Sequence, residues 1–227
     1  MRQFERVGRD KSLNSWKTEV SRETADRLQI YADLLVQWQK TINLVAPSTL
    51  GDIWNRHMAD SAQLVALAPS LSVPGPITWV DIGSGAGFPG LVVAVLLAGR
   101  ADTRVALVES DVRKCAFLGE VVRKTGISGA LAVEILNARI ENPSTQARLG
   151  RVDVISARAL APLDKLFELS APLFQPETVA FFMKGRGAVA EIEAAEQQWR
   201  FRYDLHRSRT DSEGKIVEVR DLEAKTR

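Results

Sequence analysis

The clearest chemical signal in this chain is a glycine-rich segment, VDIGSGAGFPG, at positions 80–90. A mostly apolar run, 77–82, leads into the glycines, and a second apolar run, 91–98, follows them. This order predicts a buried strand, a tight turn and the first turn of a helix. Because glycine has no Cβ and accepts positive φ, the backbone of such a turn can approach a ligand closely. The segment therefore predicts a cradle for a nucleotide-like cofactor.

Two cofactor classes compete for this turn. The literal G-x-G-x-x-G fingerprint of dinucleotide sites is present at 85–90, which favours NAD. However, the first glycine of the turn is Gly83, and counting from it places Phe88 where the third fingerprint glycine belongs. Asp81, before the turn, repels a pyrophosphate but favours a cation such as the sulfonium and ammonium groups of S-adenosylmethionine. The pattern is more typical of an S-adenosylmethionine site that includes Asp81.

Two later segments are predicted to reach the same ligand. Glu109 ends the next predicted strand, where an acid commonly accepts the two hydroxyls of a ribose. NAD and S-adenosylmethionine share that ribose, so Glu109 indicates a nucleoside without distinguishing them, and a role as a helix cap stays open. The segment 137–141 follows the third predicted strand, where adenine commonly packs, although a plain surface loop is the alternative.

The elements that must position these residues alternate between strands and helices after Pro76. Strands are predicted at 77–82, 104–109, 131–136, 152–157, 178–184, 201–206 and 215–221, and helices at 89–98, 111–125, 139–142, 162–174 and 188–199. This alternation predicts an α/β fold with a mostly parallel seven-stranded sheet and helices on both faces. Right-handed crossovers place the carboxyl ends of the parallel strands at one edge, where ligands bind.

Two helical patterns precede the sheet, at about 21–42 and 53–68, and a proline-rich linker at 69–76 follows them. The expected organisation is a polar, partly disordered terminus at 1–20, a helical cap at 21–70 and a Rossmann-like core at 77–227, with cap and core as one structural unit.

Composition narrows the class of protein. Net charge is only +2, and 45% hydrophobic with 26% charged residues is ordinary for a globular protein. The longest uncharged apolar stretch, 88–99, is too short to span a bilayer, and the N-terminus lacks an apolar signal-peptide core. A single cysteine excludes an internal disulfide, and the two histidines lack metal-ligand spacing. We therefore expect a cytoplasmic monomer that binds neither metal nor membrane.

Four motifs, in this order, resemble a known family: RHMADS at 56–61, DIGSGAGFPG at 81–90, SARA at 156–159 and MKGR at 183–186. Together they resemble ribosomal small-subunit methyltransferase G, also called glucose-inhibited division protein B, from about residue 28 to residue 219. That family has a Rossmann-like class I methyltransferase fold. Its members transfer methyl from S-adenosylmethionine to N7 of a guanine in a decoding-region loop of 16S rRNA. The resemblance implies 16S rRNA or the small ribosomal subunit as partner.

The resemblance also implies roles in cofactor binding. Gly83, Gly85 and Phe88 would line the methionine and ribose end of the cofactor, and Glu109 would bind the ribose hydroxyls. At the adenine the resemblance places Ile140 and Glu141.

Five further residues are implied at the target side of the site. Arg158 would lie at the cofactor or target edge, with a surface arginine as the alternative. Arg56 and His57 would face the cofactor cleft or the RNA, with a packed structural histidine as the alternative for His57. Lys184 and Arg186, near a predicted strand end, are candidates to hold the phosphates or carbonyl of the target nucleotide.

Transfer to guanine N7 needs no general base, because N7 has a free lone pair and no proton to lose. We therefore assign no catalytic base, and Arg158 is the candidate for positioning. The fourth predicted strand lacks the Asn/Asp-Pro-Pro-aromatic element of exocyclic-amine methyltransferases, and Cys115 lies inside a predicted helix, away from a nucleophile position. Three alternatives stay open: a methyltransferase of small molecules or proteins, a nucleotide-dependent oxidoreductase, and a non-catalytic RNA-binding module.

Overall fold

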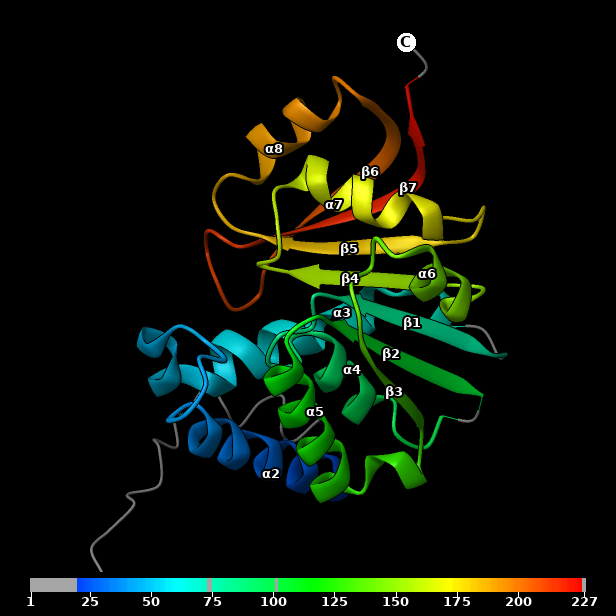
Figure 1. Ribbon diagram of the computed structural model, residues 1–227. Helices are drawn as coiled ribbons and strands as arrows, with labels where there is room; N and C mark the ends of the chain where they lie inside the picture. Colours follow the sequence, from blue (N-terminus) through cyan, green and yellow to red (C-terminus); the bar gives the residue numbers. More distant parts are fainter. Residues whose placement is uncertain (1–19, 73–74, 101, 226–227) are drawn as a thin grey trace, which may run out of the picture.

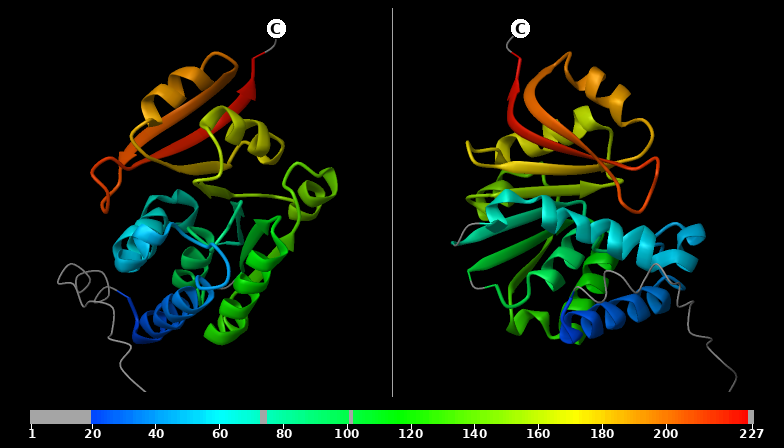
Figure 2. Two further views of the ribbon diagram at one scale, coloured as in Figure 1. Left: turned by 60° about the vertical axis from the view of Figure 1, so that its left-hand side comes forward. Right: turned by 180° about the vertical axis from the view of Figure 1, so that it is seen from behind.

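The computed structural model describes residues 20–72, 75–100 and 102–225, so the expected polar terminus at 1–20 lies, except for Val20, outside the described residues. The described chain forms one seven-stranded sheet in the order β3-β2-β1-β4-β5-β7-β6, with helices on both faces (Figures 1 and 2). Strands β1 to β5 run parallel, whereas β7 is antiparallel to both β5 and β6. The expected mostly parallel α/β sheet is confirmed.

The strands are β1 (Ile77–Ile82), β2 (Thr103–Glu109), β3 (Ala132–Asn137), β4 (Val154–Arg158), β5 (Val179–Lys184), β6 (Trp199–Arg207) and β7 (Lys215–Ala224). The α-helices are α2 (Arg22–Trp38), α3 (Asp60–Leu67), α4 (Gly90–Leu96), α5 (Val112–Thr125), α6 (Pro143–Leu149), α7 (Leu163–Ser170) and α8 (Ala188–Ala195). Short 3₁₀ segments lie at Pro47–Asp52, Pro69–Ser72, Ile127–Gly129 and Ala171–Leu173.

Side-chain caps explain where two of the predicted helices begin. The Ser21 side chain accepts a hydrogen bond from the Thr24 N–H at the start of α2. Asp111 does the same for α5, accepting from the N–H groups of Arg113 and Lys114. Each cap satisfies N–H groups that have no partner inside the helix. Gly126 ends α5 in the left-handed conformation.

One local expectation was wrong, and a second was confirmed with a difference in its first turn. The short helix predicted at 139–142 is a turn, and the helix is α6, which begins at Pro143. Proline fits the first turn of a helix because the N–H that it lacks would have no intrahelical partner there. The helix predicted at 53–68 begins with a π-helical turn, Trp54–Ala59, before α3. Such turns often occur at functional sites, and this one carries two of the candidate residues.

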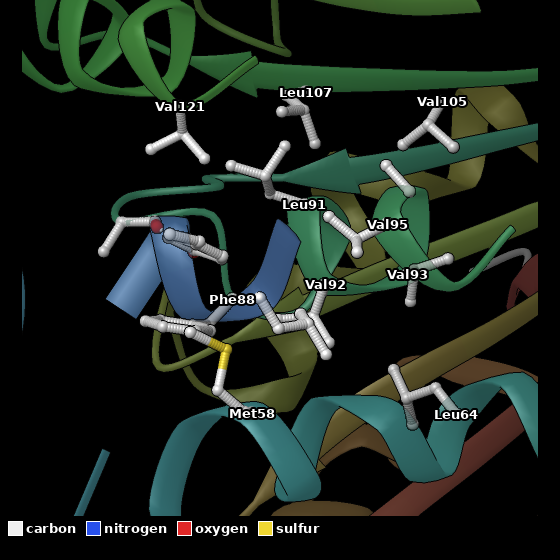
Figure 3. Close-up of a cluster of buried hydrophobic side chains, with 14 of the residues drawn as sticks. Met58, Leu64, Phe88, Leu91, Val92, Val93, Val95, Val105, Leu107 and Val121 are labelled. Carbon is white, nitrogen blue, oxygen red and sulfur yellow. Dashed lines mark hydrogen bonds between the residues drawn. The ribbon is translucent and has the colours of Figure 1, made fainter. Parts of the chain in front are cut away.

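Each face of the sheet has its own hydrophobic cluster, because successive side chains of a strand point to opposite faces. Trp79 of β1 lies in the cluster with α2, α3, α4 and α5, whereas Val80 and Ile82 lie in the cluster with α6, α7 and α8. Figure 3 shows the first cluster, in which α4 side chains such as Leu91 and Val92 lie between the sheet and the segment that carries Met58 and Leu64.

The N-terminal helices share this first cluster with the core. Leu28, Tyr31 and Leu35 of α2 are fully buried in it together with Phe117 and Leu118 of α5. Figures 1 and 2 show α2, in blue, alongside α5, in green. The cap therefore packs against the helices that flank the glycine turn. No helix within the described ranges is both long and apolar enough to cross a membrane.

Candidate functional site

A cavity of about 570 Å³ opens at the carboxyl ends of the parallel strands. It lies where the strand order reverses between β1 and β4, the position at which open α/β sheets bind ligands. Its size is within the usual range for small-molecule sites. We call it the first cavity, and its walls include these candidates from the sequence: His57, Gly83, Gly85, Phe88, Glu109, Ile140, Glu141 and Arg158.

The glycine turn leaves no room for a Cβ at three positions, among them Gly87, where a Cβ would lie 2.8 Å from Cβ of Leu91. A Cβ on Gly83, whose φ is +66°, would lie 2.6 Å from Cδ1 of Leu160. A Cβ on Gly90 would lie 2.5 Å from Cβ of Asp81. Gly90 therefore lets the backbone pass close to β1, and Gly83 lets it pass close to Leu160 in the wall of the first cavity.

Glu109 is fixed at the rim by two backbone donors. Its Oε2 accepts from the Gly85 N–H at 2.8 Å, and its Oε1 accepts from the Asp111 N–H at 2.7 Å. Each carboxylate oxygen keeps a further lone pair for a ligand hydroxyl. The helix-capping alternative for Glu109 is wrong, because Asp111 caps α5. The arrangement suits a pair of ribose hydroxyls.

Asp81 does not line the first cavity, which corrects its expected place at the ligand. Its side chain is fully buried beneath the glycine turn, because strand alternation turns it toward α4. Its Oδ1 accepts from the Ser156 hydroxyl at 2.6 Å, whereas Oδ2 has no hydrogen-bond partner among the described residues. Burial raises the pKa of Asp81 to about 6.

His57 is held by hydrogen bonds at both ring nitrogens. Arginine can only donate, so the Arg158 guanidinium donates to Nδ1, and the neutral ring must carry its proton on Nε2. Nε2 therefore donates to the Thr49 hydroxyl at 2.8 Å, and that hydroxyl donates to the Ala46 carbonyl at 2.7 Å. Burial, aided by the Arg158 and Arg56 charges, lowers the pKa of His57 to about 3. The ring stays neutral and has no free lone pair.

Arg158 is a packed residue, so the surface-arginine alternative is wrong. Its side chain is 19% exposed, and it contacts Asp60 Oδ2 at 3.3 Å and the Arg56 carbonyl at 3.1 Å. Its guanidinium carbon lies 5.6 Å from the centre of the Phe88 ring, within range for a cation–π contact. Burial lowers the pKa of Arg158, and the nearby Asp60 carboxylate opposes that effect.

A stack of aromatic rings connects helix α2 of the cap to Arg158. The Phe88 ring stacks on Tyr31 of α2 at 5.2 Å between centroids and on His57 at 4.8 Å. The Tyr31 hydroxyl donates to the Ala86 carbonyl within the glycine turn. Two helices of the cap region therefore hold one turn from the side opposite the sheet.

A second cavity, of about 360 Å³, adjoins the first. The two cavities share Thr49, His57, Arg158 and Ala159, which form a common wall. The other residues of the second cavity are mostly polar or charged: Arg56, Asp60, Met183, Lys184, Gly185, Glu191, Ser208, Thr210, Asp211, Gly214, Lys215 and Ile216.

The predicted basic residues differ in how they meet the second cavity. Lys184 lines it but is only 9% exposed, and it pairs with Glu191 at 2.6 Å, so it is not a free surface cation. Arg56 lines it, is 44% exposed and pairs with Asp211. Arg186 lines neither cavity, is 86% exposed and pairs with Glu213. Of these two candidates, Lys184 therefore lines the second cavity and Arg186 does not, because the chain turns after β5.

Sequence reasoning missed six polar residues of the second cavity: Thr49, Glu191, Ser208, Thr210, Asp211 and Lys215. The hydroxyls of Ser208 and Thr210 donate to Oδ1 of Asp60 at 2.9 Å and 2.7 Å, which ties the β6–β7 loop to α3. The hydroxyl-rich sequence SRTDS at 208–212 was a signal for such a loop. Nothing in the sequence around Glu191 indicated its place.

Comparison with known proteins decides the family. A family model described as rRNA small subunit methyltransferase G matches residues 24–217. Curated ribosomal RNA small subunit methyltransferase G of Parvibaculum lavamentivorans is 49% identical over 205 residues, which cover 90% of this chain and 86% of the relative. The protein of the same name from Methylorubrum populi is 47% identical over 203 residues, covering 89% and 91%.

This chain belongs to the ribosomal RNA small subunit methyltransferase G family. The resemblance seen in the sequence is confirmed, and the enzyme is an S-adenosylmethionine-dependent methyltransferase of ribosomal RNA. Among solved structures, a variant of MtNAS in complex with S-adenosylmethionine has a similar fold, with a TM-score of 0.56 and 14% identity, covering 93% of this chain and 79% of that chain. Precorrin-6y C5,15-methyltransferase of Geobacter metallireducens has a TM-score of 0.50 and 12% identity, covering 82% and 92%.

The residues of the first cavity fit S-adenosylmethionine. Glu109 offers two oriented acceptors for ribose hydroxyls, and the glycine turn gives the close approach that a nucleoside needs. Ile140 is buried at the cavity wall beside Glu141, where it offers an apolar surface to a base.

Proposed function

We propose that the enzyme methylates N7 of a guanine in a decoding-region loop of 16S rRNA. The observation that carries this proposal is the common wall of the two cavities, in which His57 and Arg158 are both occupied by hydrogen bonds. At that wall a ligand in the second cavity meets positioned side chains, and neither His57 nor Arg158 is free to act as a general base. N7 of guanine has no proton to remove, so that wall suits it.

The residues have separate roles in this proposal. S-adenosylmethionine supplies an electrophilic methyl group when it is bound. Gly83, Gly85 and Phe88 line its site, Glu109 accepts the ribose hydroxyls, and Ile140 with Glu141 contacts the adenine. Asp81 acts from beneath the turn by favouring positive charge nearby.

At the common wall Arg158 is a positioning residue, because its contacts with His57 and Asp60 fix the boundary between the cavities. Arg56, at the open side of the second cavity, is a candidate RNA contact.

Two competing methyl-transfer chemistries have weaker support from the same geometry. Strand β4 ends in Arg158, followed by Ala159 and Leu160, and this segment carries no amide or carboxylate to hold an exocyclic amine. A cytosine-C5 reaction needs a thiolate, but Cys115 lies on α5 and burial raises its pKa. Its thiol donates to the Glu109 carbonyl instead.

Further parts of the proposal concern how the enzyme works as a whole. We infer that residues 21–70 and 77–225 act as one unit, since α2 buries Tyr31 against the glycine turn. The enzyme acts as a monomer and without a metal ion. It works in the cytoplasm, where its ribosomal substrate is found. The target guanine is unpaired, because N7 of a paired guanine lies in the major groove, which is too deep and narrow in an RNA helix for an enzyme to reach.

The test is to map N7-methylguanosine in 16S rRNA from a strain that lacks the gene. We expect one decoding-region guanine to lose its methyl group and to regain it when the wild-type gene is supplied. Primer extension after cleavage at N7-methylguanosine locates the site, and mass spectrometry of the nucleosides identifies the modification. An unchanged 16S modification pattern, or loss of a different modified nucleotide, would falsify the proposal.

A further inference from the structure

We propose that the Lys184–Glu191 ion pair in the second cavity reads the Watson–Crick edge of the target base and selects guanine. This inference rests on the proposed function, because it takes the second cavity as the place of the acceptor base. It adds Glu191 to the site and gives Lys184, already a candidate for contact with the target nucleotide, a role in selecting the base.

The ion pair lies at the carboxyl ends of the strands, where the two cavities meet. Lys184 ends β5 and Glu191 lies on α8, and both line the second cavity, which shares its wall with the first. A base with N7 directed across that wall toward the first cavity extends its opposite edge into the second cavity. Enzymes that modify a base outside the stack read it by hydrogen bonds to that edge.

Each member of the pair keeps one group free for a ligand. The Lys184 ammonium donates to the Ala161 carbonyl at 2.7 Å and to Glu191 Oε2 at 2.6 Å, which leaves the third of its protons. Oε2 of Glu191 also accepts from the Leu163 N–H at 2.8 Å. Its Oε1 accepts no hydrogen bond from the part of the chain that the structure describes, and the side chain is 32% exposed.

The resulting donor and acceptor match guanine and mismatch adenine. Guanine presents the O6 acceptor beside the N1–H and N2–H donors, so Lys184 donates to O6 and Glu191 accepts from the ring and amino protons. Adenine presents an amino donor and an N1 acceptor at the same positions. Its amino group would face the Lys184 donor, and its N1 would face the Glu191 acceptor. A site built for such hydrogen bonds rejects the mismatched base strongly, because buried polar groups are left unpaired.

The pair is formed before any ligand arrives. Lys184 is only 9% exposed and is fixed by its two acceptors, so little side-chain freedom is lost when the base binds. The carboxylate also faces a purine that becomes cationic when N7 is methylated, which favours the product side of the step. The ion pair therefore selects the base and complements its developing charge.

The decisive variant is Glu191→Gln, because the surrounding groups set the orientation of the new amide. The Leu163 N–H and the Lys184 ammonium both donate to the Oε2 position, so the amide oxygen must lie there and the NH₂ group faces the cavity. The variant thus replaces the free acceptor by a donor at nearly constant shape. Glu193→Gln, an exposed position on the same helix, is the matched control.

The substrates are small ribosomal subunits reconstituted with 16S rRNA that carries guanosine, inosine or adenosine at the target position. With wild-type enzyme we expect kcat/KM to fall roughly 10-fold from guanosine to inosine, which lacks the 2-amino donor. In Glu191→Gln we expect kcat/KM for guanosine to fall roughly 10- to 100-fold, and the guanosine-to-adenosine preference to shrink by a similar factor. Glu193→Gln should have the same kcat/KM and the same base preference as the wild-type enzyme. The affinity for S-adenosylhomocysteine should be unchanged in both variants.

Two results would overturn the inference: equal rates on guanosine and inosine with the wild-type enzyme, or unchanged base preference in Glu191→Gln. If the variant does not fold, the wild-type comparison of guanosine with inosine still decides. Failure of the proposed function is seen separately, because methylation of subunits that carry 7-deazaguanosine at the target excludes N7 as the acceptor whatever the base preference.

Discussion

The two cavities at the carboxyl edge of the sheet are built from different groups. The first is formed largely by backbone: a glycine turn whose positions 83 and 90 exclude a Cβ, and N–H groups that hold Glu109. The second is formed by paired charges, including Arg56 with Asp211 and Lys184 with Glu191. Backbone geometry fixes one ligand closely, whereas paired side chains can discriminate among related ligands by charge and hydrogen-bond pattern.

This difference separates the effects that substitutions should have. Changes in the first cavity should weaken cofactor binding and leave base preference alone. Changes in the second cavity should alter transfer or selectivity at nearly constant cofactor affinity. The common wall at His57 and Arg158 is the place where the separation should fail.

The largest effect is expected in the first cavity. Glu109→Ala removes the acceptor of two ribose hydroxyls and leaves two backbone N–H groups without their partner, so the dissociation constant for S-adenosylhomocysteine should rise roughly 100-fold. Isothermal titration calorimetry measures it, with Glu109→Gln as a control of the same shape and a smaller loss. The guanosine-to-adenosine preference should not change in either variant. A changed preference would break the separation between the cavities.

Arg158→Lys tests the common wall. Lysine keeps the charge but loses the planar fork that contacts His57, Asp60 and the Arg56 carbonyl, so the wall shifts. We expect kcat to fall about 100-fold, as positional errors near 1 Å can cause, while cofactor affinity changes by less than about 5-fold. Single-turnover methylation and calorimetry give the two values, with the exposed Arg186→Lys as control. A loss of cofactor affinity without a loss of kcat would show that Arg158 acts only in cofactor binding.

His57 and Asp81 should respond to acid in opposite directions. The native pKa of His57, about 3, lies below its unfolded value, so the unfolded chain binds more protons and acid destabilises the fold. His57→Gln should therefore gain about 2 kcal/mol over wild type when the pH falls from about 7.5 to about 5. Urea unfolding at both pH values measures it.

The raised pKa of Asp81, about 6, has the reverse sign, because the native state binds the extra proton between pH 3.8 and that value. Stability from Asp81 is present at low pH and is lost as the pH rises through about 6. Asp81→Asn should lose about 1 kcal/mol relative to wild type over the same acid shift. Equal slopes for both variants would mean that the two groups titrate alike and that their surroundings do not differ.

The smallest effect is expected at the cap. Tyr31→Phe keeps the ring on Phe88 but removes the hydrogen bond to the Ala86 carbonyl, which should cost about 1 kcal/mol of unfolding free energy. Cofactor affinity should fall slightly, since the glycine turn loses one support. Tyr203→Phe, at an exposed position of β6, should stay within about 0.5 kcal/mol of wild type. Identical losses in both variants would show that the cap does not support the turn.

The same contrast explains how much the sequence could predict. The first cavity was predictable because one continuous segment forms its turn, and Glu109 follows at the end of the next strand. The alternation of strands and helices likewise indicated the sheet. Asp81 was misplaced beside the ligand because a sequence does not show which face of the sheet a strand end turns toward the ligand.

The second cavity depends on pairings between distant segments. Asp60 meets Ser208 and Thr210 across the sheet edge, and Lys184 meets Glu191 only because the chain turns back after β5. Such pairs have no periodic signal, since their partners are set by packing of whole elements. The motif around Lys184 therefore indicated a site, but its ion pair and the divergence of Arg186 were visible only in the fold.

The common wall also has a thermodynamic consequence. His57 and Arg158 line both cavities, so any shift of these side chains caused by a ligand in one cavity would change the binding free energy of a ligand in the other. Thermodynamic linkage makes that change reciprocal: the factor by which S-adenosylhomocysteine alters affinity for the ribosomal subunit equals the factor by which the subunit alters affinity for S-adenosylhomocysteine. Any such coupling between the two binding steps would pass through two side chains.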